Sequence, residues 1–281
     1  MKKILALILT LIMVMLCFTA CSFNVDNGGN DSDNGDGDGN DTRAKLIVGY
    51  TDYAPMNYME GGKLVGFDTE LAEAVAEKLD MDIEFVEINW GKKYLELDSG
   101  AINCIWNGFT SNCADDDGVQ RSDKVDFSVA YMNNAQCVVV KSAELADYTS
   151  ADVLADKAGA AEDGSAGAGK VMEFIGEENE DNFIAKDAQT DALTEVLAGS
   201  ANFAIVDRTM AEAMVGKGDF TSLAIAEDIE IENELYSIGF KKGSELTEKV
   251  NQAIKELAED GTLMELAKKY KLENYFIVDF D

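Results

Sequence analysis

The sequence contains no histidine, a single proline and only 23 basic residues against 54 acidic ones. Without histidine, the Ser-His-Asp and Cys-His catalytic arrangements and histidine-ligated zinc sites are impossible. The net charge of −31 argues against a nucleic-acid partner, because phosphates require a basic surface. Since 47% of the 281 residues are hydrophobic, the chain is globular and long enough for one large or two smaller domains.

The apolar run Ile4–Leu16 follows two lysines and precedes small residues, which is typical of a secretory signal peptide. A membrane-spanning helix needs about 20 apolar residues, more than this run supplies. The tripeptide Thr19-Ala20-Cys21 resembles a lipobox, in which the cysteine is lipid-modified and becomes the mature N-terminus. We therefore expect a lipoprotein signal peptide at 1–20 and lipidation of Cys21. The alternative is an ordinary cleaved signal with an incidental cysteine.

Residues 21–43 are rich in aspartate, asparagine and glycine and nearly free of apolar side chains. Such a composition cannot bury enough surface to offset chain entropy, so we expect a flexible, lipid-anchored tether. The aspartates also invite a calcium-site interpretation. The ligand spacing and closing glutamate of an EF-hand loop are missing, however, which favours the tether.

From residue 44 onward, short apolar runs alternate with helical patterns, which predicts an α/β protein with mostly parallel sheets. One helix is expected to begin near Phe67, with Asp68 or Thr69 as its N-cap. Strands are expected at 46–50, 83–88, 101–106, 135–141, 157–161, 203–206 and 236–240. Two α/β units joined without a proline-rich linker predict two lobes that face a cleft.

Three segments in order carry a resemblance to a known family: LVGFD at 64–68, NGFT at 107–110 and RSDKVDFS at 121–128. Together with their surroundings they resemble the amino-acid branch (family 3) of the extracellular solute-binding proteins of ABC importers. The resemblance extends over nearly everything from Lys45 to Phe276.

This resemblance implies a two-lobed, hinged periplasmic-binding-protein fold of type II, in which each lobe is a mostly parallel sheet flanked by helices. The first lobe is expected at 44–132 and 237–281, and the second lobe, with the hinge strands, at 133–236. Such proteins close around their ligand by hinge motion, and the permease recognises the closed form.

A free amino acid offers one carboxylate and one ammonium group, so its receptor needs a buried cation and a buried anion. The resemblance assigns Arg121 to the α-carboxylate, which its planar fork can pair on both oxygens. It assigns Asp207, at a strand end, to the α-ammonium group. Arg121 could instead lie on a surface loop, and Asp207 could instead cap the following helix. Gly108 and Thr110 are expected to add a backbone or hydroxyl partner.

Four further positions complete the predicted site. Ser165 belongs to a Gly-Ser turn before a helix, where free N–H groups are expected to face a carboxylate. Tyr53 and Trp90 match the aromatic positions that enclose the ligand side chain, although core packing is their alternative role. Glu162 lies beside the turn and favours a polar or cationic ligand over an anionic one, unless it simply faces water.

These assignments predict a binding protein that captures a free amino acid by cleft closure and delivers it to an ABC transporter permease. We expect a monomer, lipid-anchored on the extracytoplasmic face of the cell membrane, with no catalysis, cofactor, metal or nucleic-acid partner. One alternative is a dehydratase-type enzyme on the same scaffold, with Glu162 as its acid/base group. Another is a sensor that presents the ligand to a receptor. Cys104 and Cys137 are expected to be buried, and a bridge between Cys104 and Cys113 is left open.

Overall fold

The computed structural model describes residues 43–115 and 117–277. The predicted signal peptide, the lipidation site Cys21 and the tether up to residue 42 lie outside the described residues. Within the described ranges, no helix has the length and apolar character needed to cross a membrane.

Ten strands of the described chain form one continuous sheet, and two more form a separate hairpin. Along the sheet the order is β4 (Asp82–Glu87), β1 (Lys45–Tyr50), β5 (Cys104–Thr110), β12 (Asn233–Phe240), β7 (Met132–Lys141), β10 (Phe203–Asp207), β8 (Gly159–Glu162) and β9 (Phe183–Lys186). The short strands β6 (Asp126–Phe127) and β11 (Leu223–Ile225) pair with β12 and β7. The hairpin consists of β2 (Tyr58–Glu60) and β3 (Lys63–Val65).

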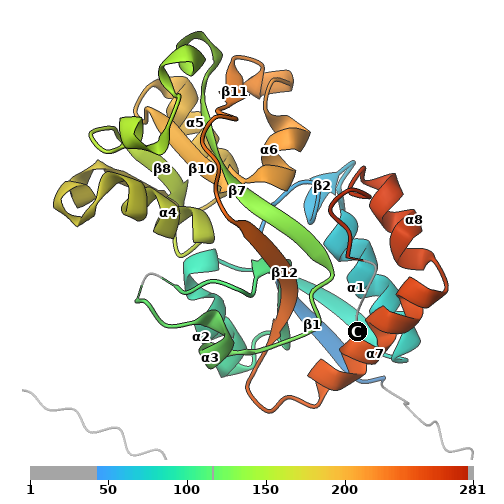
Figure 1. Ribbon diagram of the computed structural model, residues 1–281. Coiled ribbons are helices and arrows are strands. Elements are labelled where there is room, and N and C mark those ends of the chain that lie inside the picture. The colour runs from blue at the N-terminus through green and yellow to red at the C-terminus, as the bar shows by residue number, and fades with distance from the viewer. Residues whose placement is uncertain (1–42, 116, 278–281) are drawn as a thin grey trace, which may run out of the picture. The chain divides into compact units, whose positions relative to one another are not determined.

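The sheet contains two sets of parallel strands, which form the cores of two lobes. Strands β4, β1 and β5 are parallel in the first lobe, and β10, β8 and β9 are parallel in the second. The long strands β7 and β12 run antiparallel between the two sets (Figure 1), pairing Met132–Ala135 with Asn233–Tyr236. We call β7 and β12 the crossing strands. The two-lobed α/β fold is therefore as predicted, whereas the exact lobe limits stay predictions.

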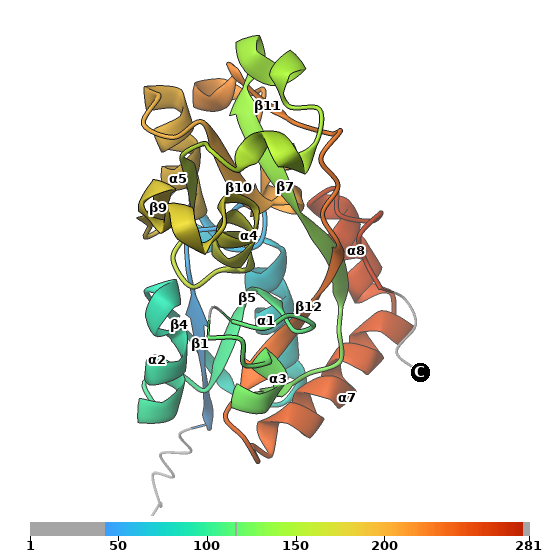
Figure 2. The same cartoon turned by 60° about the vertical axis from the view of Figure 1, so that its left-hand side comes forward.

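Helices cover both lobes (Figure 2). In the first lobe they are α1 (Phe67–Lys78), α2 (Lys93–Ser99), α3 (Arg121–Lys124), α7 (Leu246–Glu259) and α8 (Thr262–Lys269), with a 3₁₀ turn at Trp90–Lys92. In the second lobe they are α4 (Ala166–Ile175), α5 (Gln189–Ala198) and α6 (Arg208–Met214), with 3₁₀ turns at Ser142–Asp147, Ala151–Leu154, Glu177–Asn182 and Gly218–Phe220. Helix α1 packs against β4 and β5, and α7 and α8 pack against α1.

The predicted N-cap of α1 is wrong. The cap position is Gly66, at φ 129°, and no side chain makes a capping hydrogen bond there. A Cβ atom at Gly66 would meet the carbonyl oxygen of Met56, so only glycine fits there. Asp68 is fully buried instead, and its carboxylate accepts a 2.7 Å hydrogen bond from the N–H of Gly108.

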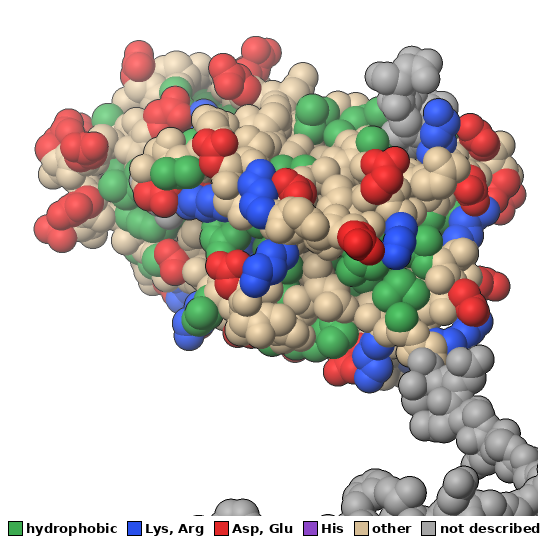
Figure 3. Space-filling model, turned by 90° about the horizontal axis from the view of Figure 1, so that it is seen from below, with side chains coloured by type: hydrophobic (Ala, Val, Ile, Leu, Met, Phe, Trp, Pro, Cys, Tyr) green, Lys and Arg blue, Asp and Glu red, His purple; other side chains and the backbone are tan. Residues whose placement is uncertain are grey.

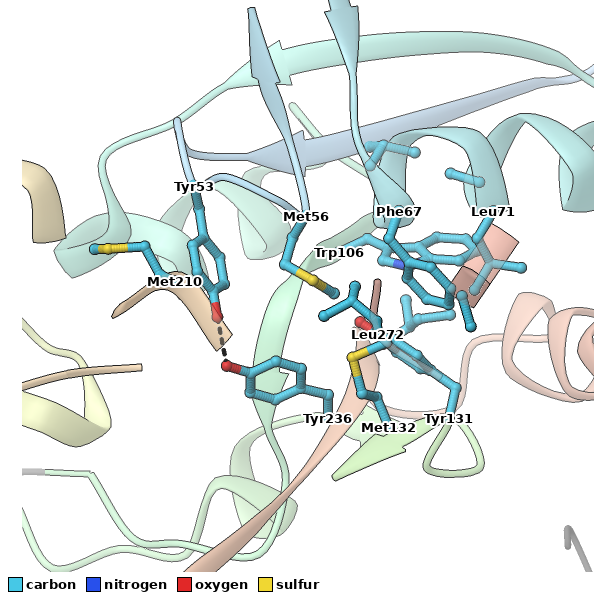
Figure 4. Close-up of a cluster of buried hydrophobic side chains, with 14 of the residues drawn as sticks. Tyr53, Met56, Phe67, Leu71, Trp106, Tyr131, Met132, Met210, Tyr236 and Leu272 are labelled. Carbon is cyan, nitrogen blue, oxygen red and sulfur yellow. Dashed lines mark hydrogen bonds between the residues drawn. The ribbon is translucent and has the colours of Figure 1, made fainter. Parts of the chain in front are cut away.

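A cluster of buried side chains joins the crossing strands to α1 and to the loop after β1 (Figure 4). Phe67 stacks on Tyr131 at 6.1 Å between ring centroids, and Trp106 and Met56 are fully buried beside them. Burying each of these large side chains stabilises the folded protein by about 1.5–3 kcal/mol. The crossing strands therefore pack on an apolar cluster of the first lobe.

The surface carries charges of both signs. On the face shown in Figure 3, basic side chains lie among acidic ones rather than in a separate block. Lys45 pairs with Glu84, and Lys78 pairs with Asp260, both on the first lobe. Exposed pairs of this kind contribute at most about 1 kcal/mol each, so charge pairing on the surface does not explain the fold.

Candidate ligand-binding site

A cavity lies between the lobes, where β5, β8 and β10 reach their carboxyl ends. Such strand ends are where open α/β sheets bind ligands. The lining side chains and backbone groups come from Trp90, Asn107, Gly108, Thr110, Arg121, Gln136, Glu162, Ser165, Ala166, Gln189 and Asp207. Seven of the eight predicted ligand-binding residues are therefore brought together in one place; the exception is Tyr53.

Arg121 begins α3 and is only 1% exposed, so it does not lie on a surface loop. Its Nε donates to Asp115 at 2.7 Å, and its Nη1 donates to the carbonyl oxygen of Thr110 at 3.2 Å. The guanidinium carbon lies 5.1 Å from the ring centroid of Phe109, a cation–π distance. The guanidinium is therefore fixed from two sides while it borders the cavity.

Asp207 ends β10 and lies at the cap position of α6, yet its carboxylate makes no capping bond to that helix. Its Oδ1 accepts hydrogen bonds of 2.7 Å from Asn134 and from Gln136, and its Oδ2 accepts one from Gln189. Burial raises the pKa of Asp207. These three amides and the hydroxyl of Tyr236, which also acts on the carboxylate, are all neutral, so its hydrogen-bonding partners among the described residues do not balance its charge.

Glu162 ends β8 and is 4% exposed, which excludes the alternative that it faces bulk water. Its carboxylate borders the cavity. Burial, with Asp207 nearby, raises the pKa of Glu162 to about 8, and the charges of Lys93 and Arg121 oppose this shift only in part. A carboxylate buried in this way is costly, so a further cation or hydrogen-bond donor placed beside it would be stabilising.

Glu234, on the crossing strand β12, escaped the sequence analysis. It is almost fully buried, and its Oε2 accepts from Asn134 at 2.9 Å and from Gln136 at 3.0 Å, the two amides that also bond to Asp207. Burial and the nearby Asp207 raise the pKa of Glu234 to about 7. A sequence signal for this cluster existed, because Asn134 and Gln136 are two residues apart in a predicted strand region and therefore lie on one face of β7.

The two predicted aromatic residues differ in placement. Trp90 borders the cavity and also packs edge-on against Phe109 at 5.3 Å, so it combines both predicted roles. Tyr53 does not border the cavity. Its hydroxyl is 2.6 Å from those of Thr209 and Tyr236, and Figure 4 shows it pointing toward Tyr236. Tyr53 therefore connects the first lobe, a crossing strand and α6.

The Gly-Ser turn was predicted to have free N–H groups that face a carboxylate, but the N–H of Ser165 is already bonded. The N–H of Ser165 donates to the carbonyl oxygen of Glu162 at 3.1 Å and is not free, and the hydroxyl of Ser165 caps α4 by accepting from Ala168 at 3.0 Å. The carbonyl oxygen of Gly164 accepts from Lys93 at 2.9 Å and from Arg121 at 3.4 Å. Two cations of the first lobe thus contact the second lobe at the cavity mouth.

The N–H of Gly108 and the hydroxyl of Thr110 were predicted to bind the ligand, but both already bond to side chains of the protein. Gly108 has φ 57°, its N–H is used by Asp68, and a Cβ atom there would collide with the ring of Tyr53. The hydroxyl of Thr110 donates to Glu234 at 3.2 Å. Burial raises the pKa of Asp68 to about 7, partly countered by the Gly108 bond.

The three cysteines of the described residues are free, so the Cys104–Cys113 bridge does not form. Cys104 and Cys137 are buried in strands, as predicted. Among residues 43–115 and 117–277, no group of three or more acidic or cysteine side chains has the arrangement of a metal site.

Comparison with known proteins places this two-lobed scaffold and its inter-lobe cavity in a class. The chain belongs to the bacterial extracellular solute-binding proteins, family 3, whose family model matches residues 46–273. Its structural neighbours confirm the predicted type II periplasmic-binding-protein fold. The predicted role, amino-acid capture outside the cytoplasm and delivery to an ABC transporter, is confirmed as well.

Individual relatives are similar over nearly the whole chain. The arginine-binding extracellular protein ArtP of Bacillus subtilis is 30% identical over 275 residues, covering 96% of this chain and 98% of the relative. The L-cystine-binding protein TcyA of the same organism is 27% identical and covers 96% and 97%. Among solved structures, an ancestral arginine-binding protein bound to arginine has a TM-score of 0.71 at 29% identity, covering 82% of this chain and 99% of that one. The arginine-, lysine-, histidine-binding protein ArtJ from Geobacillus stearothermophilus has a TM-score of 0.71 at 27% identity, covering 80% and 94%.

Proposed function

We propose that this protein binds a cationic amino acid, with arginine as the first candidate. The observation that carries the proposal is Glu162, a buried carboxylate that borders the cavity close to a second buried carboxylate, Asp207. A cationic ligand side chain would offset this concentration of negative charge, whereas an anionic side chain would add repulsion.

In this proposal the ligand backbone is held by two groups of opposite charge. Arg121 binds the α-carboxylate through its Nη atoms, and Asp207 binds the α-ammonium group. Asp207 suits an ammonium group because its own bonds come from neutral amides and leave its charge uncompensated. Trp90 covers the ligand side chain, and an indole face also attracts a cation.

The charge balance of the cavity supports the same choice. Glu162, Asp207 and Glu234 are three buried carboxylates, and the two buried cations near them are Arg121, which is paired with Asp115, and Lys93, which bonds to the carbonyl oxygen of Gly164. Arginine or lysine adds one net positive charge to this environment, and glutamate adds one net negative charge. Similarity to arginine-binding relatives points the same way.

We also propose that the protein is a non-catalytic monomer, attached to the membrane through a lipid on Cys21 and the tether at 21–43. The similar proteins are named as binding proteins rather than enzymes. Two acyl chains on the modified cysteine would give stable attachment, which a single chain does not.

Calorimetric titration of the purified protein with the twenty amino acids and cystine tests the ligand class. We expect arginine or lysine to bind at least about tenfold more tightly than glutamine, a difference of about 1.4 kcal/mol. Tightest binding of glutamate or aspartate would contradict the proposal. Mass spectrometry of the recovered ligand should show it chemically unchanged, as expected for a protein without catalytic activity.

A further inference from the structure

The segment between β5 and α3 contains a carboxylate, Asp115, that bonds to Arg121. Asp115 accepts the Nε–H of Arg121 on its Oδ1 at 2.7 Å. Its Oδ2 accepts from the hydroxyl of Tyr94 at 2.6 Å and from Lys124 at 2.9 Å. Both oxygens are therefore bonded, and Asp115 is itself held by α2 and α3.

The backbone of this segment holds Asp115 in place. Ala114 and Gln120 form an antiparallel bridge, and the N–H of Arg121 donates to the carbonyl oxygen of Cys113 at 3.1 Å. Closer to β5, the N–H of Ser111 donates to the carbonyl oxygen of Leu235 on a crossing strand at 2.8 Å. Asp115 therefore belongs to a turn whose two sides are bonded to each other and whose start is bonded to the crossing strand β12.

A guanidinium group has five N–H donors in a fixed plane. Asp115 takes the single donor on Nε, and the carbonyl oxygens of Thr110 and Gly164 take one donor each on Nη1 and Nη2. One N–H donor therefore remains on each Nη atom, and these two donors are left for a ligand carboxylate.

We propose that Asp115 is a positioning residue, which fixes Arg121 so that its two Nη atoms face the α-carboxylate of the ligand. The inference rests on the proposed role of Arg121. Asp115 could instead weaken ligand binding, because its charge offsets the charge of Arg121 and competes with the ligand carboxylate. The two effects predict opposite changes in affinity when Asp115 is replaced, so they can be separated.

The experiment compares an amino acid with the amine that lacks its carboxylate, for example arginine with agmatine. For each variant, calorimetry gives the dissociation constant of the amine divided by that of the amino acid. This ratio measures how much the α-carboxylate contributes to affinity. The amino acid that wild type binds most tightly is used, so the experiment decides the role of Asp115 even if that amino acid is not arginine.

Asp115→Ala should lower this ratio about tenfold, since an unfixed guanidinium loses its orientation. Asp115→Asn keeps an oxygen that can accept from Nε and should restore part of the ratio. Asp117→Ala is the matched control, because Asp117 lies in the same segment and pairs with the same Lys124 but does not contact Arg121. Its ratio should equal that of wild type.

Two outcomes would overturn the proposal. Equal weakening of the amino acid and the amine in Asp115→Ala leaves the ratio unchanged and shows a merely structural role. A higher ratio in both Asp115 variants shows that the carboxylate competes with the ligand instead of positioning Arg121.

Discussion

At the scale of single residues, Glu162 is expected to lower the stability of the ligand-free protein and is also proposed to bind the ligand. Replacing it by glutamine removes a buried carboxyl group with a raised pKa, and with it the free-energy cost of protonating or desolvating that group on folding. We therefore expect Glu162→Gln to raise the melting temperature of the ligand-free protein and to weaken arginine binding by about tenfold or more. Differential scanning calorimetry and isothermal titration measure the two effects. Glutamine affinity is the internal control and should change little; loss of arginine affinity without a stability gain would argue against an uncompensated carboxylate.

The protonation of the same residue predicts a pH dependence. The pKa of Glu162 is about 8 in the folded protein against 4.5 ordinarily, because burial disfavours the charged form. A raised carboxyl pKa means that folding stability falls as pH rises from about 4.5 through 8. Binding a cation requires the ionised form, so below pH 8 arginine binding should release a proton to the buffer, and affinity should rise from pH 6 to pH 8.

Titration in buffers of different ionisation enthalpy measures that proton release. Glu162→Gln should remove most of it, and the remainder belongs to Asp207 and Glu234, which face the same region with raised pKa values. Proton release that is unchanged in Glu162→Gln would assign the titration to the other two carboxylates.

At the scale of elements, one chain of hydroxyl groups connects the two lobes. Tyr53 follows β1, Tyr236 lies on β12 and Thr209 lies on α6, with 2.6 Å from the Tyr53 hydroxyl to each of the other two. Tyr53→Phe removes both bonds and should destabilise the protein by about 1–2 kcal/mol. Arginine affinity should fall less than about threefold, because Tyr53 does not border the cavity. Urea denaturation and titration test this; a tenfold affinity loss at unchanged stability would restore the predicted direct contact with ligand.

The elements also show what a sequence can predict. The strands and the order of the segments follow from local apolar patterns and from the family resemblance, so the sequence predicts Asp207 at a strand end and Glu162 beside the Gly-Ser turn. Glu234 and its amide partners were missed because their contact depends on the pairing of β7 with β12, about one hundred residues apart along the chain. The N-cap of α1 was missed for the same reason, since Asp68 bonds to Gly108 across the lobe instead of to its own helix.

At the scale of the whole molecule, the ligand site and the predicted membrane anchor use different parts of the sequence. The residues that border the cavity lie between Trp90 and Asp207, whereas the predicted lipidation site is Cys21. Ligand binding and membrane attachment should therefore be separable by mutation.

Replacement of the predicted lipidation site, Cys21→Ser, tests this separation. Once its signal peptide is removed, the variant should leave the membrane fraction and appear in the aqueous phase of a detergent partition, because it has no acyl chain to insert into the bilayer. Its affinity for arginine should equal that of wild type, since the residues that border the cavity lie between Trp90 and Asp207. Metabolic labelling with a fatty acid should mark wild type and not the variant, while Cys17→Ser, inside the signal peptide, should leave labelling intact. If wild type remains unlabelled and partitions into water, the N-terminal segment is an ordinary cleaved signal, and the protein reaches its permease by diffusion alone.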